Sequence, residues 1–128
     1  MTKIFAHRGA SAYAPENTME AFHLAAKQGA DGIELDVHVT KDGEVVVTHD
    51  EKIDRVSNGS GFVKDMTLRE LKRLSFHNHM ESYVGAGIPT LREVLEFVKT
   101  TTMAVNIELK TGLYWYPHIE EKTVALVH

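Results

Sequence analysis

The sequence contains no cysteine among its 128 residues. This absence excludes a disulfide framework and a thiolate metal site, so any metal ion must be held by oxygen or imidazole groups, which suit a hard cation. No apolar run approaches the length of a membrane span, and residues 1–6 lack the apolar core of a signal peptide. We therefore expect a cytoplasmic protein without stable membrane insertion.

Basic residues are also scarce. The chain has 14 Lys and Arg against 18 Asp and Glu, which gives a formal net charge of -4, and the basic residues are dispersed. A surface of this kind does not favour nucleic acid as a partner. Hydrophobic residues make up 43% of the chain, which is enough for the core of one modest domain over residues 1–128.

The segment 33–39, Ile-Glu-Leu-Asp-Val-His-Val, alternates apolar and polar residues. Side chains alternate across a β-strand, so Glu34, Asp36 and His38 share one face of the predicted strand. Two carboxylates on one row repel each other unless a cation lies between them. The pattern favours a site for a metal ion or a cationic ligand, and a solvent-facing polar row is the alternative.

The residues before this strand predict a strand followed by a helix. An apolar strand is expected over 3–7, and Asn17 is placed to be the N-cap of a helix in which Glu20 completes a capping box. Gly29 is expected to end that helix. Since the next strand follows at once, the pattern is that of a βαβ unit with parallel strands.

The second half of the chain continues the alternation. Asp-Gly at 42–43 predicts a hairpin turn that returns along 45–48. Thr67 and Thr90 each begin a helix with a capping box, and a further alternating strand is expected over 103–110. A last helix is predicted towards the end of the chain. The whole is an α/β pattern with about three βα units.

Three carboxylates and two imidazoles are candidates for chemistry. Glu34, Asp36 and Glu108 lie on two predicted strands, and carboxylates together with waters are the ligands that Mg²⁺ or Ca²⁺ requires. His7 and His49 follow two other apolar segments. Imidazoles that flank a metal ion can serve as general base and general acid near neutral pH.

Two cationic side chains lie beside these groups. Arg8 follows His7 directly and Lys110 lies two residues after Glu108, and both suit phosphate oxygens. Acids for a metal ion, imidazoles for proton transfer and cations for an anion together indicate metal-assisted phosphate ester chemistry.

Seven short segments match, in order, the motifs of a known family. They are His7-Arg8-Gly9-Ala10, Pro15-Glu16-Asn17-Thr18, Glu34-Leu35-Asp36-Val37, Lys41-Asp42-Gly43, His49-Asp50, Ile88-Pro89-Thr90-Leu91 and Glu108-Leu109-Lys110. With these segments the chain resembles the glycerophosphodiester phosphodiesterase family along nearly its whole length.

The resemblance implies a TIM (β/α)₈ barrel with a small insertion after the second strand, here residues 51–89. It implies that the three carboxylates bind a divalent metal ion, Ca²⁺ or Mg²⁺. It further implies that His7 and His49 are the acid and base pair and that Arg8 and Lys110 bind the substrate phosphate.

The resemblance also implies a reaction. In the family, a neighbouring hydroxyl of the substrate is thought to attack phosphorus, and water then opens the cyclic phosphate. The products would be glycerol 3-phosphate and an alcohol such as choline or ethanolamine. A lysophospholipase D-like activity on a related phosphodiester is an alternative within the same class.

The length of the chain fits only part of such a barrel. A TIM barrel takes about 250 residues, so the expected fold is a partial barrel of about the first three βα units. Its sheet would expose an edge unless a C-terminal half or another copy of the chain covered it. A non-catalytic barrel fragment that keeps metal or phosphate binding and self-associates is therefore a second hypothesis.

Overall fold

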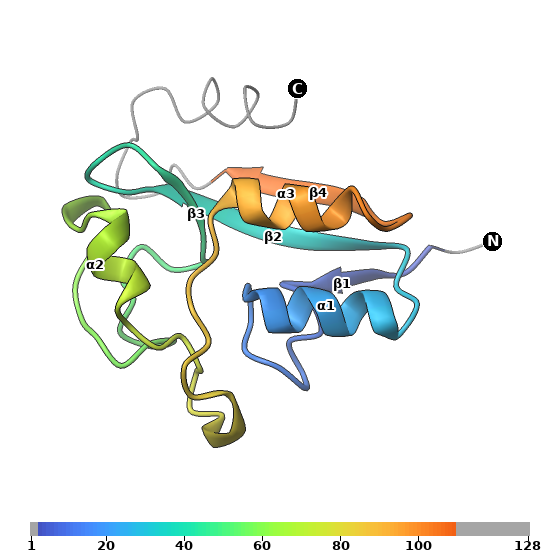
Figure 1. Ribbon diagram of the computed structural model, residues 1–128, viewed down its shortest axis with the longest axis horizontal. Helices are drawn as coiled ribbons and strands as arrows, with labels where there is room; N and C mark the ends of the chain where they lie inside the picture. Colours follow the sequence, from blue (N-terminus) through green and yellow to red (C-terminus); the bar gives the residue numbers. More distant parts are fainter. Residues whose placement is uncertain (1–2, 110–128) are drawn as a thin grey trace.

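We describe the protein from a computed structural model, which describes residues 3–109 (Figure 1). The strands are β1 (Phe5–His7), β2 (Gly32–Val39), β3 (Val45–Val47) and β4 (Ala104–Leu109), and the α-helices are α1 (Met19–Lys27), α2 (Leu68–Lys72) and α3 (Leu91–Val98). Short 3₁₀ turns occur at Val63–Asp65 and Glu81–Tyr83. Lys110 and the helix expected near the end of the chain lie outside the described residues.

Strand β2 is the centre of the sheet. β1 pairs with its first half and β4 with most of its length, both in parallel, whereas β3 pairs with its last three residues in antiparallel fashion. Val37 pairs with both Val47 of β3 and Leu109 of β4, so β3 and β4 occupy opposite edges of β2. The parallel βαβ arrangement and the hairpin are thus confirmed.

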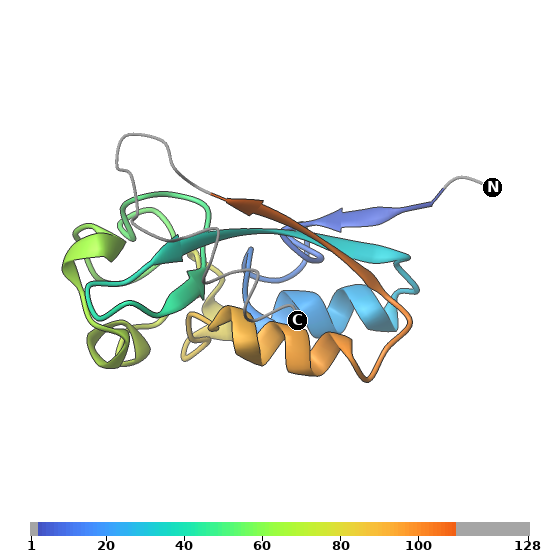
Figure 2. The ribbon, with the colours of Figure 1, turned by 90° about the horizontal axis from the view of Figure 1, so that it is seen from above.

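Both longer helices cover one face of this sheet. α1 and α3 lie on the same side of β2 in the view along the sheet (Figure 2). Ile33, Leu35 and Val37 of β2 point into a core that they share with Phe22 of α1 and Leu91 of α3, and all five are almost completely buried. Because the apolar residues of β2 point to the helices, its alternate polar residues point to the other face.

The start of α1 differs from the prediction. Thr18, and not Asn17, is the N-cap, and its side chain accepts a hydrogen bond from the backbone N–H of Ala21. Asn17 instead has a left-handed backbone, with φ of 56°, and directs its amide to Asp36. The prediction was wrong because Asx and Thr are both good caps, and contact with β2 decides between them.

The other predicted helix ends agree with the structure. Thr67 and Thr90 both form capping boxes, with Glu70 and Glu93 as their partners. Gly29 follows the C-cap of α1 with φ of 80°, as a helix-ending glycine requires.

The chain between β3 and α3 has a hydrophobic cluster of its own. Val46 of β3 packs there with Ile53, Val63, Leu71 and Ile88, all nearly or fully buried. Backbone bonds from Lys41 N–H to the Met66 carbonyl and from Val47 N–H to the Pro89 carbonyl attach this segment to the β2–β3 hairpin. The segment is therefore fixed against the carboxyl end of β2.

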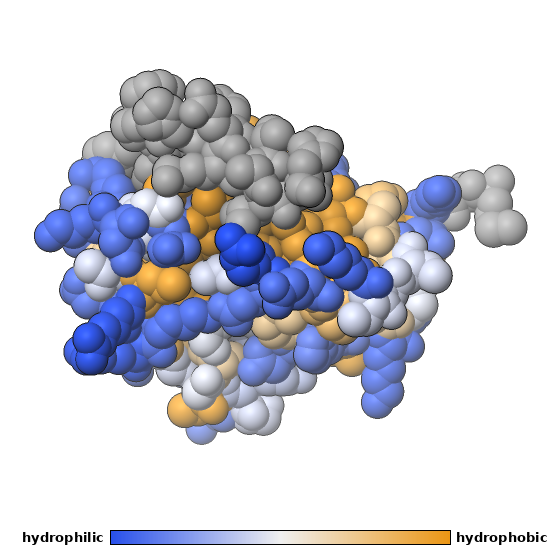
Figure 3. All heavy atoms as spheres, turned by 45° about the horizontal axis from the view of Figure 1, so that its top comes forward, coloured by the Kyte–Doolittle hydropathy of each residue, from blue (hydrophilic) through white to orange (hydrophobic). Residues whose placement is uncertain are grey.

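One face of the molecule carries both polar and apolar residues. Hydrophilic residues are numerous on the face seen in Figure 3, and hydrophobic residues gather towards its middle. Ile4, Tyr13 and Val84 are the large hydrophobic side chains that are most exposed in the described part. Within residues 3–109, no helix has the length and apolarity needed to cross a membrane.

Candidate active site

The polar face of the sheet brings four of the predicted site residues together. In the strand register His7 is paired with Glu34, and Asp36 with Glu108. Paired residues of parallel strands lie on one face, so these four side chains form two adjacent rows across β1, β2 and β4. His7 and Glu108 are exposed, Glu34 is partly buried and Asp36 is buried.

Asp36 is held by two neighbours from the loop between β1 and α1. The side-chain amide of Asn17 donates to Asp36 Oδ2 at 3.1 Å, and Arg8 Nε lies 3.7 Å from the same oxygen. Arg8 Nη1 also donates to Glu16 Oε2 at 3.2 Å. The positive charge of Arg8 therefore lies between two carboxylates, next to the row that holds Glu108.

The backbone directs Arg8 towards this face. Its N–H donates to the Glu34 carbonyl at 2.7 Å, which continues the β1–β2 pairing by one residue. Arg8 then turns into the left-handed region with φ of 57°, and Gly9 follows with φ of 79°. A non-glycine residue in this conformation is uncommon and is often found at functional sites.

His49 follows β3 and is held at two points. Its Nδ1 lies 2.9 Å from Asp50 Oδ1, and its carbonyl accepts a hydrogen bond from Nε2 of the buried His38 at 3.0 Å. Since a carboxylate only accepts hydrogen bonds, the Nδ1 atom carries the proton in this contact. Nε2 of His49 is then the nitrogen left for chemistry.

A chain of charged groups joins the neighbourhoods of Arg8 and His49. Arg55 donates from Nη1 to Glu16 Oε1 at 2.7 Å and from Nε to Asp50 Oδ2 at 2.8 Å. Glu16 is bound in turn to Arg8, and Asp50 to His49. The loop before α1 and the residues after β3 are thereby connected through side chains.

Burial and positive charge have opposite effects on the pKa values of Glu16 and Asp50. Burial alone would raise the pKa of Glu16, but the hydrogen bond and charge of Arg55, with the charge of Arg8, lower the pKa below its usual value. Burial likewise opposes the hydrogen bonds of Arg55 and His49 at Asp50, whose pKa is also lowered. Hydrogen bonds to the two acids raise the pKa of Arg55. All three groups are therefore charged near neutral pH.

The carboxylates are hard oxygen donors, as Mg²⁺ or Ca²⁺ prefers. As they are arranged within residues 3–109, no three His, Asp or Glu side chains form a group that could hold a metal ion. Asp36 and Glu108 are nevertheless neighbours in the register, and Glu34 lies two residues before Asp36 on the same face. The type of donor fits a hard cation, and Glu108 is exposed on this face.

Five residues near the site were not predicted to belong to it. Glu16, Asn17, His38 and Asp50 contact the candidate residues directly, and Arg55 contacts Glu16 and Asp50. His38 shares the alternation of Glu34 and Asp36, so its place on this face was foreseeable. The bond of Arg55 to Glu16 had no local signal, because the two residues lie 39 positions apart in the sequence.

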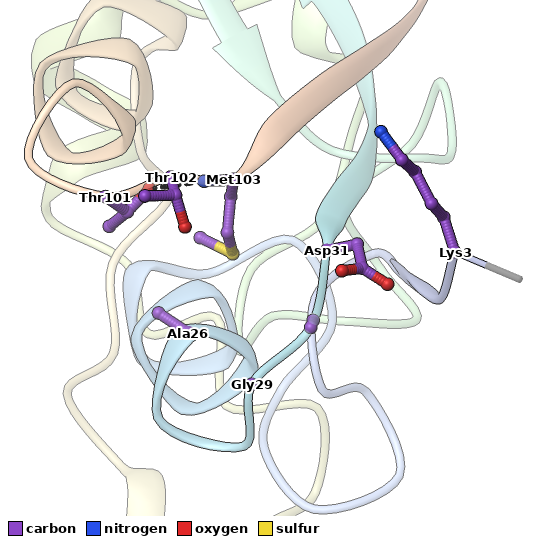
Figure 4. A pocket seen from close by; sticks show the side chains of 8 residues that line it. Lys3, Ala26, Gly29, Asp31, Thr101, Thr102 and Met103 are labelled. Carbon is purple, nitrogen blue, oxygen red and sulfur yellow. Dashed lines mark hydrogen bonds between the residues drawn. The ribbon is translucent and has the colours of Figure 1, made fainter. Parts of the chain in front are cut away.

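A separate cavity of about 410 Å³ lies at the opposite end of the strands. Figure 4 shows residues before β2 and β4, among them Asp31, Thr101 and Met103, around this cavity, with Lys3 at its side. Asp31 Oδ2 accepts from the Ile4 N–H at 2.7 Å, and the Thr101 hydroxyl bonds to the backbone of its own turn. Asp31 thus joins the residues before β1 to those before β2, and Thr101 closes its own turn. None of the predicted site residues lines this cavity, so it is not the candidate site.

Comparison with known proteins identifies the family. The model of the "Glycerophosphoryl diester phosphodiesterase family" matches residues 7–126. A glycerophosphodiester phosphodiesterase of Caldanaerobacter subterraneus subsp. tengcongensis is 52% identical over 127 residues, which are 98% of this chain and 52% of that protein. One of Bacillus altitudinis is 55% identical over 124 residues, which are 95% of this chain and 51% of that protein.

Solved structures give the same result. A glycerophosphodiester phosphodiesterase of Agrobacterium tumefaciens superposes with a TM-score of 0.88 at 44% identity, over 99% of this chain and 52% of the other. An Oleispira antarctica phosphodiesterase, solved with the product sn-glycerol-3-phosphate, superposes with a TM-score of 0.86 at 37% identity, over 98% and 50%. The chain thus spans about half the length of these relatives. It belongs to the glycerophosphoryl diester phosphodiesterase family.

Proposed function

We propose that this chain carries the metal-binding and proton-transfer residues of a phosphodiesterase that hydrolyses glycerophosphodiesters to glycerol 3-phosphate and an alcohol. The observation that supports this proposal most strongly is the strand register, which sets His7 beside Glu34 and Asp36 beside Glu108 on one face. Family membership and the product bound to the Oleispira antarctica relative support the class of substrate.

Glu34, Asp36 and Glu108 would hold one divalent cation, Ca²⁺ or Mg²⁺. When bound, such an ion polarises phosphoryl oxygens and neutralises charge that develops on them. Asn17 and Arg8 fix the carboxylate of Asp36 for this role, since both contact its Oδ2 atom. Asp36 is also the most buried of the three proposed ligands.

His7 and His49 would transfer the protons. One imidazole takes the proton of a substrate hydroxyl that attacks phosphorus, and the other gives a proton to the oxygen of the leaving alcohol. In the second half of the reaction, water opens the cyclic phosphate and the two roles are exchanged. The contact of Asp50 with His49 Nδ1 leaves Nε2 as the transferring atom on that ring.

Arg8 and Lys110 would bind the phosphate. The guanidinium of Arg8 carries five N–H donors, and its Nε is buried without a hydrogen-bond partner within the part of the chain described. A phosphate oxygen near Arg8 would add a bond to a cation that already contacts two acids, Glu16 and Asp36. Lys110 directly follows β4, the strand that carries Glu108.

For the architecture, we propose a partial TIM barrel in which β1, β2 and β4 are its first three parallel strands. The order of these strands and the position of α1 and α3 on one face support it, because barrel helices all lie outside the sheet. Residues 51–89 would be an insertion, and their separate hydrophobic cluster supports this assignment.

A chimera tests the proposed function. Residues 1–128 would replace the matching part of the Caldanaerobacter relative, of which this chain covers 52%. We expect the chimera to release glycerol 3-phosphate from glycerophosphocholine in the presence of Ca²⁺ or Mg²⁺, as followed by ³¹P NMR. His7→Ala should lower the rate by at least about 10²-fold, the usual contribution of a general acid or base.

The parent relative is the control for the assay, and circular dichroism controls for folding. A folded chimera that is inactive while the parent is active would contradict the proposal. Release of lysophosphatidic acid from lysophosphatidylcholine in preference to the glycerophosphodiester would favour the lysophospholipase D-like alternative.

A further inference from the structure

Within the described residues, the imidazole of His49 has one side-chain hydrogen bond, the contact of Nδ1 with Asp50. About a third of its side chain is exposed, at 32%, so solvent borders part of the ring. His38 fixes only the main chain of this residue, through the carbonyl. The contact between Nδ1 and Asp50 is therefore what sets the direction of the ring and the nitrogen that carries the proton.

Asp50 itself needs to be held, because its side chain is also about one-third exposed, at 31%. Arg55 Nε donates to Oδ2 of Asp50 at 2.8 Å, and Arg55 Nη2 lies 3.4 Å from Oδ1. With Oδ2 occupied by Arg55, Oδ1 is directed at the His49 ring. A planar guanidinium holds a carboxylate in one orientation far better than a single ammonium group does.

Arg55 is anchored at its other side by Glu16. Nη1 and Nη2 of Arg55 donate to the two carboxylate oxygens of Glu16 at 2.7 and 3.0 Å. The Glu16 side chain is only 9% exposed and also binds Arg8. The side chain of Arg55 is 46% exposed, but acids contact its guanidinium on two edges.

We propose that Arg55 is a positioning residue for catalysis: it holds Asp50 so that the His49 ring keeps its proton on Nδ1 and presents Nε2 to the substrate. The catalytic meaning of this arrangement depends on the proposed function, whereas the arrangement itself does not. Through Glu16, the same residue couples the orientation of His49 to that of Arg8. The segment 51–89, which carries none of the proposed catalytic or metal-binding residues, thereby contributes to the site through Arg55.

The lowered pKa of Asp50 and of Glu16 agrees with this assignment. Hydrogen bonds and the positive charge of Arg55 oppose burial in both cases and keep the two acids ionised. An ionised Asp50 can only accept, so the contact with His49 requires a proton on Nδ1.

The experiment records the ring-nitrogen ¹⁵N shifts of His49 in the ¹⁵N-histidine-labelled 128-residue chain. Spectra are taken without metal or substrate at a pH of about 8, where an ordinary imidazole is neutral. A His49→Gln spectrum assigns the signal among the 8 histidines. We expect the Nδ1–H form to predominate in the wild type.

Arg55→Gln should lower the ratio of the Nδ1–H to the Nε2–H form by about fivefold, the effect of one hydrogen bond of ordinary net strength. Arg55→Lys should restore part of the ratio, since lysine returns the positive charge but lacks the paired N–H donors of the guanidinium. Arg92→Gln, an exposed arginine of α3, is the matched control and should leave the ratio unchanged.

A wild-type ring with its proton on Nε2, or an Arg55→Gln ring that keeps the wild-type ratio, would overturn the proposal. Backbone amide spectra show whether Arg55→Gln folds. If it does not, Arg55→Lys is compared with the wild type instead. The ratio should still be lower in Arg55→Lys, because the paired N–H donors are lost, and an unchanged ratio would overturn the proposal. Failure of hydrolysis in the chimera would not alter these ring signals, so the two proposals can fail separately.

Discussion

Single residues in the left-handed backbone region shape the loop that enters the site. Arg8, Gly9 and Asn17 all have positive φ, and the Asn17 N–H donates to the Arg8 carbonyl at 2.9 Å. The two ends of the β1–α1 loop are therefore joined directly beside Asp36. The strain of two non-glycine residues in this region is offset by side-chain contacts to Asp36 and Glu16.

Gly9 lies in this loop where the structure leaves no space for a Cβ atom. A Cβ atom at Gly9 would lie 2.8 Å from both the carbonyl carbon and the Cβ of Ala21, whereas a Cβ at Gly29, with nearly the same φ, would meet nothing within 4 Å. Gly29→Ala should lose about 1 kcal/mol of unfolding free energy for its φ alone. Gly9→Ala should lose about 2 kcal/mol more, because backbone of α1 must move.

Denaturant unfolding of the two variants measures this difference. Equal losses would show that α1 yields to the added methyl group and that close packing of Gly9 is unimportant.

The position of a residue could be predicted when it depended on neighbours in the sequence, and not when it depended on contacts with distant residues. Glu34 and Asp36 could be placed on one face because alternation along a strand is a local property. The contact of Asn17 with Asp36 could not, because it depends on how a loop returns to the sheet, and Asn is equally suited to a helix cap. For Lys110, the assignment to the phosphate remains a prediction, since it lies outside the described residues.

At the scale of elements, the register between strands brings the candidate site residues together. Each carboxylate is placed by its own strand, but Asp36 and Glu108 become neighbours only through the pairing of β2 with β4. The starts of α2 and α3 and the hairpin could be predicted from capping boxes and from Asp-Gly, which are short patterns with a clear physical cause. The pairing of strands distant in sequence could be foreseen only as a consequence of the expected parallel fold.

The contact of Arg55 with Glu16 and Asp50 joins two loops and should depend on pH. Both acids have a pKa below the ordinary values of 4.5 and 3.8, so the folded state binds their protons less readily than the unfolded state does. The stabilisation is therefore complete above a pH of about 5 and is lost as the pH falls through the lowered folded values.

Arg55→Gln should remove this contribution. We expect the variant to lose about 1 kcal/mol near neutral pH, a modest value because the half-exposed guanidinium is screened by solvent. The loss should shrink as the pH falls below about 4.5, when Glu16 becomes protonated in the unfolded wild type. Unfolding curves of both proteins between neutral and acid pH measure it, and a loss that grows on acidification would contradict the assignment.

At the scale of the whole molecule, the described residues 3–109 place one layer of helices against one face of the sheet. α1 and α3 cover one face of the sheet, and the opposite face carries His7, Glu34, Asp36 and Glu108 (Figure 2). In a complete barrel such a face would be enclosed by the remaining strands. The relatives, about twice as long as this chain, are consistent with an active site shared between two halves.

The central claim is that the carboxylate face of the sheet binds a divalent cation. Isothermal titration calorimetry of the 128-residue chain with Ca²⁺ and with Mg²⁺ tests it most directly, independently of substrate and of the rest of a barrel. We predict saturable binding of at least one of these ions to the wild type, its loss in Glu108→Gln, and its retention in Glu96→Gln, an exposed acid of α3. Absence of binding to the folded wild type, or equal binding by Glu108→Gln, would contradict the claim.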